Sequence, residues 1–253
     1  MLSGKERREF KNRATWRSGH LTTFNLKLSD FQTLKYKEVI QEIFSEHFFP
    51  DVDITDLAAN GFDMNRINKS IKILKNSNMQ LFEYLHKYGK NYEFGPGEVT
   101  LFCLINDATL GGGSVSVDLT TQTGKYEVKG SQISRNGYAY DFKTGGTFSV
   151  DEVKNALVDL NKKHGLGGSA ASMASSILDT LKKLEPAAYA EIEKRYAELT
   201  YDNYFSKHKV IFVNNNESNA TRGLVEAFKY VDKKDISIER ITSNVIKPKV
   251  LLK

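Results

Sequence analysis

The sequence predicts an α/β protein with a mixed central sheet flanked by helices, in the element order αβββαβ. Three observations predict this class. An apolar helix begins at Glu98, directly after the turn signal Gly-Pro-Gly at 95–97. Three short stretches typical of strands follow within residues 114–144. A helical pattern over 149–165 and a later buried-type strand over 209–215 complete the order.

The remaining stretches are basic or mainly helical. Apolar residues recur near a 3.6-residue period over much of 25–92, which predicts helices there. The stretch 221–231 is interpreted as a helix, and two closing strands are predicted over 236–252. The predicted division of the chain is a basic N-terminal arm (1–24), a helical region (25–92) and an α/β core (93–253) that contains a helical insertion at about 150–200.

Composition excludes several classes of protein. No run approaches the roughly 18 apolar residues of a membrane-spanning helix, and the first residues are too polar for a secretory signal. Cys103 is the single cysteine, so an internal disulfide and a cysteine-rich metal cluster are excluded. The histidines are scattered without metal-ligand spacing, which argues against a zinc site. These features predict a protein that is neither secreted nor embedded in a membrane.

Positive charge is concentrated at the start of a chain whose net charge is +5. Such a stretch suits nucleic-acid phosphates or an acidic protein groove. A solvated tail is the alternative. The basic residues are Lys5, Arg7, Arg8, Lys11, Arg13 and Arg17, against Glu6 and Glu9.

The stretch VDLTTQTGKYEVKGSQ, residues 117–132, reads as a β-hairpin with charged interior positions. A two-residue turn at 123–124 would place Asp118 opposite Lys129, with Glu127 on the same face. Thr120 would then lie opposite Glu127. The apolar residues Val117, Leu119, Tyr126 and Val128 would take the opposite face and pack on the core.

Two carboxylates beside a lysine are typical of a site for a hard divalent cation. Mg²⁺ prefers oxygen ligands and commonly takes one or two carboxylates together with waters and phosphate oxygens. Lys129 could orient a nucleophilic water or stabilise charge on a phosphorane. The alternative is an exposed cross-strand salt-bridge ladder, worth roughly 0.2–1 kcal/mol per pair.

The element order and the pattern G-x-G-E … D … E-V-K-G together resemble the PD-(D/E)xK nuclease superfamily, which has the restriction-endonuclease-like fold. The resemblance covers roughly residues 93–215 and looks closest to bacteriophage-encoded members. It implies that Asp118 and Glu127 bind Mg²⁺ or Mn²⁺ and that Lys129 assists attack of water on a phosphodiester. Glu98 matches the helix carboxylate that many members bring to the same site.

Further roles follow from this resemblance. The backbone carbonyl of Val128 is a possible third metal ligand. Gln132 and Arg135 are placed to touch substrate, although solvated strand-end residues are the alternative interpretation.

Two functions from different classes therefore stand side by side. The first is a Mg²⁺-dependent DNA nuclease, phage-encoded, acting in the host cytoplasm or carried in the virion. The second is a non-catalytic structural or assembly protein of the virion, built on a nuclease-like fold. Its basic arm and helical regions would then bind other virion proteins.

Overall fold

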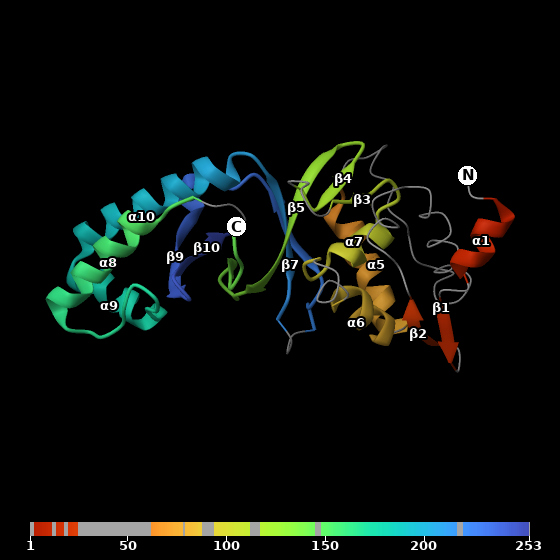
Figure 1. The fold of residues 1–253 in the computed structure, drawn as a ribbon, viewed down its shortest axis with the longest axis horizontal. Helices are drawn as coiled ribbons and strands as arrows, with labels where there is room; N and C mark the ends of the chain where they lie inside the picture. Colours follow the sequence, from red (N-terminus) through yellow and green to blue (C-terminus); the bar gives the residue numbers. More distant parts are fainter. Residues whose placement is uncertain are drawn as a thin grey trace. The chain divides into compact units, whose positions relative to one another are not determined.

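Helices and strands are interspersed along the chain, and the strands form an antiparallel open sheet flanked by helices (Figure 1). This confirms the predicted mixing of α and β elements. The computed structural model describes residues 3–11, 14–17, 20–24, 62–77, 79–87, 94–111, 117–144, 148–216 and 220–252. The chain divides into two units. The first unit is Met1–Gly130 with Ile211–Phe228, and the second is Ser131–Val210 with Lys229–Lys253.

Three helices supply much of the core of the first unit: α5 (Met64–Ser77), α6 (Met79–Lys87) and α7 (Glu98–Leu104). In α5 and α6 the apolar residues recur at helical spacing, so that each of these helices buries one stripe, whereas every residue of α7 is buried. This core includes Ile67, Ile71, Leu74, Phe82, Leu85, Leu101, Phe102, Leu119, Tyr126 and Val128.

The predicted basic arm contains regular structure. It forms α1 (Gly4–Lys11) and an antiparallel hairpin of β1 (Ala14–Arg17) and β2 (His20–Phe24). Lys5 and Glu9 are exposed and pair one turn apart on α1. The side chains of the other basic residues except Arg8 lie outside the described part of the chain, as does the predicted helical stretch 25–61.

The sheet of the first unit contains β3 (Thr109–Leu110), β4 (Leu119–Thr121), the start of β5 (Gly124–Ile133), the end of β7 (Lys209–Asn214) and β8 (Val225–Lys229). β4 lies between β3 and β5, and β7 pairs with β5 and β8. Every pair with a described register is antiparallel, whereas the sequence predicts a mixed sheet. Short hairpin connections such as that between β4 and β5 enforce this antiparallel pairing.

The interpretation of residues 221–231 as a helix is wrong, because β8 occupies this stretch. Gly223 has a φ of 84°, which lies outside the right-handed helical region, so an α-helix cannot run through this residue. The side chain of Asn68 on α5 binds both backbone groups of Val225, the first residue of this strand. Its Nδ2 donates to the Val225 carbonyl at 2.7 Å, and its Oδ1 accepts from the Val225 amide at 2.7 Å.

The second unit combines the predicted helical insertion with the predicted closing strands. β6 (Tyr138–Tyr140) pairs with the end of β5 and with β10 (Val245–Leu251), which pairs with β9 (Ile236–Thr242). Figure 1 shows α8 (Asp151–His164), α9 (Ser175–Leu184) and α10 (Pro186–Thr200) beside β9 and β10. A π-helical turn η3 (Tyr201–Phe205) and a 3₁₀ turn η4 (Lys233–Asp235) complete the unit.

The coarse α/β class is thus confirmed, and the stretch after Glu98 does contain a helix followed by strands. The order differs from the prediction in the short strand β3, which precedes β4. The three helices between β6 and β7 lie where the helical insertion at about 150–200 is predicted. None of the helices in the described ranges has the length and apolar character needed to cross a membrane. The predicted boundaries at 24 and 92 stay predictions.

Candidate active site

The turn before α7 lies tightly against two strands of the first unit. A Cβ atom on Gly130 of β5 would stand 2.9 Å from the Cβ atom of Pro96. Gly97 has a φ of 91°, and a Cβ atom there would stand 2.9 Å from Cγ1 of Val213 on β7. Glycine at both positions lets the turn approach the sheet closely. The first residue of α7, Glu98, is thereby brought toward the sheet.

The Glu98 carboxyl is buried, with 6% of the residue exposed. The Gly95 amide donates a hydrogen bond of 2.6 Å to Glu98 Oε1. A Cβ atom on Gly95 would stand 2.5 Å from that oxygen, so any other residue would displace the carboxyl from this position. Burial raises the pKa of Glu98 to about 8, the negative charge of Asp118 adds to this rise, and the Gly95 amide opposes it.

Asp118 lies immediately before β4 and attaches to β5 through both its backbone and its side chain. Its amide donates to the Tyr126 carbonyl at 3.1 Å. Its carboxylate Oδ2 accepts a hydrogen bond of 2.8 Å from the Val128 amide. The side chain therefore takes the place of a backbone carbonyl in the strand ladder, which fixes the carboxylate beside β5.

The predicted register of this hairpin is wrong by two residues. The turn is Gln122–Thr123 rather than 123–124, and it pairs Thr120 with Lys125 and Leu119 with Tyr126. Asp118 is thus not opposite Lys129, nor Thr120 opposite Glu127. Since side chains alternate with a period of two, a shift of two leaves every side chain on its predicted face. The predicted core residues Val117, Leu119, Tyr126 and Val128 are all buried.

Lys129 lies between two carboxylates. Its Nζ donates to Glu127 Oε2 at 2.9 Å and lies 3.6 Å from Asp118 Oδ2. All three side chains are largely shielded from solvent, with 18%, 9% and 26% exposed for Lys129, Glu127 and Asp118. These residues and Glu98 are named here the carboxylate cluster.

Negative charge exceeds positive charge in this cluster. Burial raises the pKa of Asp118 to about 6, Lys129 opposes the rise, and the charge of Glu127 and a hydrogen bond with its carboxyl support it. Three carboxyl groups therefore compete for the charge of one ammonium group. The cluster favours a proton or an additional cation.

The donor set fits a hard cation held by few protein ligands. Within the described ranges, no group of three or more His, Cys, Asp or Glu side chains is arranged to hold a metal ion. Mg²⁺ commonly binds only one or two carboxylates and completes its shell with waters and phosphate oxygens. Asp118 and Glu127, which come together across the hairpin, satisfy that requirement, and ligation by the Val128 carbonyl stays a prediction.

The two predicted substrate-contacting residues lie in the second unit. Gln132 pairs with Tyr140 between β5 and β6, and Arg135 is exposed in the turn that follows β5. Both placements agree with strand-end residues, and the substrate role of each stays a prediction. Sequence reasoning did not find the role of Gly95, although its position three residues before Glu98 in G-x-G-E is the signal for it.

Comparison with known proteins adds no relative. A scan against family models, a search of curated proteins and a search of solved structures each found no match to this chain.

Proposed function

We propose that this protein is a Mg²⁺-dependent DNA nuclease that hydrolyses phosphodiester bonds and is encoded by a bacteriophage. The observation that carries the proposal is the carboxylate cluster, in which Lys129 contacts both Glu127 and Asp118 and the buried Glu98 interacts electrostatically with all three. The phage origin and the restriction-endonuclease-like αβββαβ core rest on the resemblance of the motif to the PD-(D/E)xK superfamily.

Each member of the cluster has a role in this reaction. Asp118 and Glu127 would hold Mg²⁺ or Mn²⁺, and the ion would polarise the scissile phosphate and supply a hydroxide-like water. Lys129 would donate hydrogen bonds to that water or to the charge developing on phosphorus. Glu98 would act as a helper carboxyl at the buried edge of the site.

The balance of charges supports this function over a purely structural ion pair. A structural cluster is stable when its charges are matched and hydrogen-bonded. Here one lysine faces three carboxyl groups, and the pKa values of Glu98 and Asp118 are raised as a result of burial and mutual repulsion. Such a surplus of negative charge is useful to a protein that binds a divalent cation.

A non-catalytic virion assembly protein is the second candidate, and one observation favours it. Lys129 already contacts both Glu127 and Asp118, as a residual salt-bridge cluster would. In this case α1 with its basic residues, together with the helices of each unit, would supply surfaces for other virion proteins. The cluster would then bind no cation.

DNA cleavage by matched variants tests the proposal. Linear, circular and branched DNA would be incubated with the protein in Mg²⁺ and, separately, in Mn²⁺. We expect wild type to cut at least one form, and Asp118→Asn and Lys129→Met to lose cleavage at least about a hundredfold, as loss of transition-state stabilisation predicts. Asp118→Asn keeps an acceptor for the Val128 amide, so the fold is retained.

The control is Asp159→Asn, which removes an exposed carboxylate of the second unit whose ion-pair partner among the described residues is Lys162, at 3.6 Å. This variant should cut like wild type. If wild type leaves all three DNA forms intact in both metals, the enzymatic proposal fails. Absence of Mn²⁺ binding to the wild type by calorimetry would then favour the assembly protein.

A further inference from the structure

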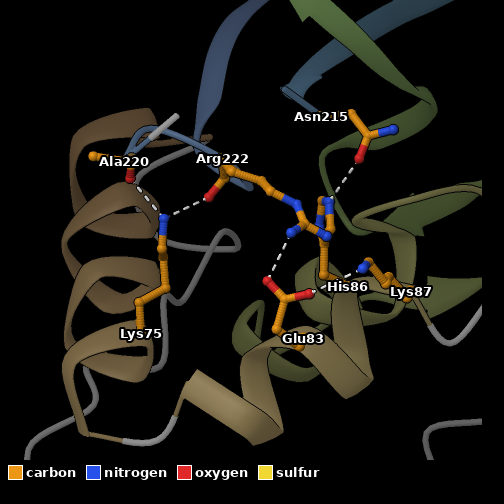
Figure 2. A network of polar contacts seen from close by, with 7 residues as sticks. All are labelled: Lys75, Glu83, His86, Lys87, Asn215, Ala220 and Arg222. Atoms are coloured by element: carbon orange, nitrogen blue, oxygen red, sulfur yellow. Dashed lines mark hydrogen bonds and ion pairs between the residues drawn. The ribbon is translucent and has the colours of Figure 1, made fainter. Parts of the chain in front are cut away.

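A second polar cluster of the first unit surrounds Arg222, in the turn between β7 and β8 (Figure 2). Arg222 is 8% exposed, and its Nη1 donates to Glu83 Oε1 on α6 at 2.8 Å. Lys75 on α5 holds the backbone of the same turn. Its Nζ donates to the carbonyl oxygens of Ala220 at 2.6 Å and Arg222 at 2.9 Å.

Half of the Arg222 guanidinium makes no hydrogen bond. Nε and Nη2 are buried and have no partner among the described residues. A buried N–H group without an acceptor costs about 1–3 kcal/mol, and more when it carries charge. These two nitrogens share one edge of the planar group, and that edge can donate to two oxygens of one oxyanion.

Among the described side chains around Arg222, positive charge exceeds negative charge. Arg222 and Lys87 both contact the carboxylate of Glu83, whose Oε2 lies 3.4 Å from Lys87 Nζ, whereas Lys75 points to the backbone of the turn (Figure 2). Burial, followed by the charge of Arg222, lowers the pKa of Lys75. His86 adds no charge, because burial lowers its pKa to about 4. Among the described charged side chains that line the pocket described next, Lys75 and Arg222 stand against Glu83, and an anion would offset the remaining positive charge.

A pocket adjoins these cations. It has a volume of about 270 Å³ and is lined by Lys75, Phe82, Glu83 and Arg222, with Asn76 and Met79 among its other walls. One water occupies only about 30 Å³, so the pocket has room for a tetrahedral oxyanion. The Lys75 amine stands 5.2 Å from the centre of the Phe82 ring, and two of its three N–H groups donate to carbonyls. The third is left for a ligand.

We infer that this pocket binds a tetrahedral oxyanion, a phosphate or phosphate ester. The unpaired edge of Arg222 supplies two hydrogen bonds, and the remaining N–H of Lys75 supplies a third. The inference stands independently of the carboxylate cluster and of nuclease activity, because none of its residues belongs to that cluster.

Thermal unfolding of the full chain without divalent metal tests the site. Inorganic phosphate would be titrated against chloride at matched ionic strength. A ligand that binds only the folded state raises Tm with its concentration, so phosphate should raise Tm and chloride should not. Absence of any difference between the two salts would overturn the inference.

Two variants locate the binding. Arg222→Lys keeps the charge but removes the two-donor edge, and should weaken the phosphate affinity about tenfold or more. Lys72→Gln removes a cation from an exposed position of α5 outside the pocket, and should bind like wild type. Equal weakening in both variants would show that phosphate binds diffusely to a basic surface, and the proposed site would be wrong.

A third variant tests the site even if Arg222→Lys does not fold. Glu83→Gln removes the only carboxylate that faces the described cations while leaving an oxygen to accept from Arg222 Nη1. Phosphate affinity should rise several-fold in this variant. An unchanged or reduced affinity would contradict the inference.

The source of the phosphate is distinguished by DNA binding. A short duplex would be titrated into Asp118→Asn and into Asp118→Asn with Arg222→Lys, without divalent metal. Weaker binding by the double variant, with competition by phosphate, would assign the pocket to DNA backbone phosphates. Equal DNA binding with a retained phosphate effect on Tm would assign it to a free phosphate or a small phosphate ester.

Discussion

At the scale of single residues, Glu98 is the side chain whose behaviour depends most on its surroundings. The carboxyl combines burial, a hydrogen bond from Gly95 and two nearby carboxylates. Burial is the largest of these effects, and it favours the protonated form. The ionisation of Glu98 is therefore coupled to folding and to any cation bound nearby.

The metal-free protein should lose stability as the pH rises from 6 to 8. The pKa of Glu98 is about 8 in the folded protein and 4.5 ordinarily, so the folded state holds a proton that the unfolded state has released. The resulting contribution to the free energy of unfolding is fully present below about pH 4.5 and is lost as the pH rises through 8. Urea unfolding in EDTA should show a loss of roughly 2 kcal/mol in the free energy of unfolding between pH 6 and pH 8.

Glu98→Gln is the matched variant for this measurement. It stays neutral at every pH and still accepts a hydrogen bond from Gly95, so its stability should change much less between pH 6 and 8. Asp118, with a pKa of about 6, adds a smaller loss that begins at lower pH and remains in the variant. An equal loss of stability in both proteins would contradict a raised pKa for Glu98.

At the scale of elements, the hairpin shows what sequence can and cannot specify. Alternation of apolar and polar residues predicts which side chains of β4 and β5 are buried, because only that arrangement covers the core. It does not specify register, since turns at 122–123 and 123–124 give the same faces. The prediction of a helix over 221–231 is wrong for a related reason. The apolar residues of this stretch fit a helix, but hydrogen bonds with Asn68, which is distant in sequence, stabilise the strand β8 instead.

The turn that presents α7 gives a prediction at this scale. Gly130→Ala should destabilise the first unit by about 1–3 kcal/mol, because the added methyl group would overlap Pro96 on the 95–97 turn. It should also reduce DNA cleavage, since the same turn positions Glu98. Denaturant unfolding and cleavage of one DNA substrate would be measured together.

Gly4→Ala is the control for this substitution. A Cβ atom on Gly4 meets nothing within 4 Å, and the residue lies in α1. Its stability and cleavage should match wild type or improve slightly. Wild-type stability and activity in Gly130→Ala would show that the turn tolerates displacement.

At the scale of the whole molecule, each unit is assembled from two separate parts of the chain. The chain leaves the first unit inside β5 and returns to it inside β7. No turn or linker in the sequence marks these crossings, because both fall within continuous strands. The sequence predicts one core over 93–253, and this division stays a prediction.

Ligand binding should consequently protect one unit selectively. In hydrogen exchange, phosphate should slow the amides of the first unit that exchange by unfolding of that unit, by an amount that grows with phosphate concentration. Amides in α8, α9 and α10 should change less. Equal slowing throughout both units would show that they unfold only together.

The hydrogen bond between Asp118 and the Val128 amide also provides a way to detect cation binding by NMR. Its Oδ2 accepts the hydrogen bond of the Val128 amide, so an ion that draws electron density from the carboxylate also weakens that bond. The amide proton of Val128 should then shift upfield in an NMR titration with Mg²⁺, a diamagnetic ion that leaves the signal sharp. The chemical shift of the Val128 amide proton would thus report cation binding in the absence of DNA and of catalysis.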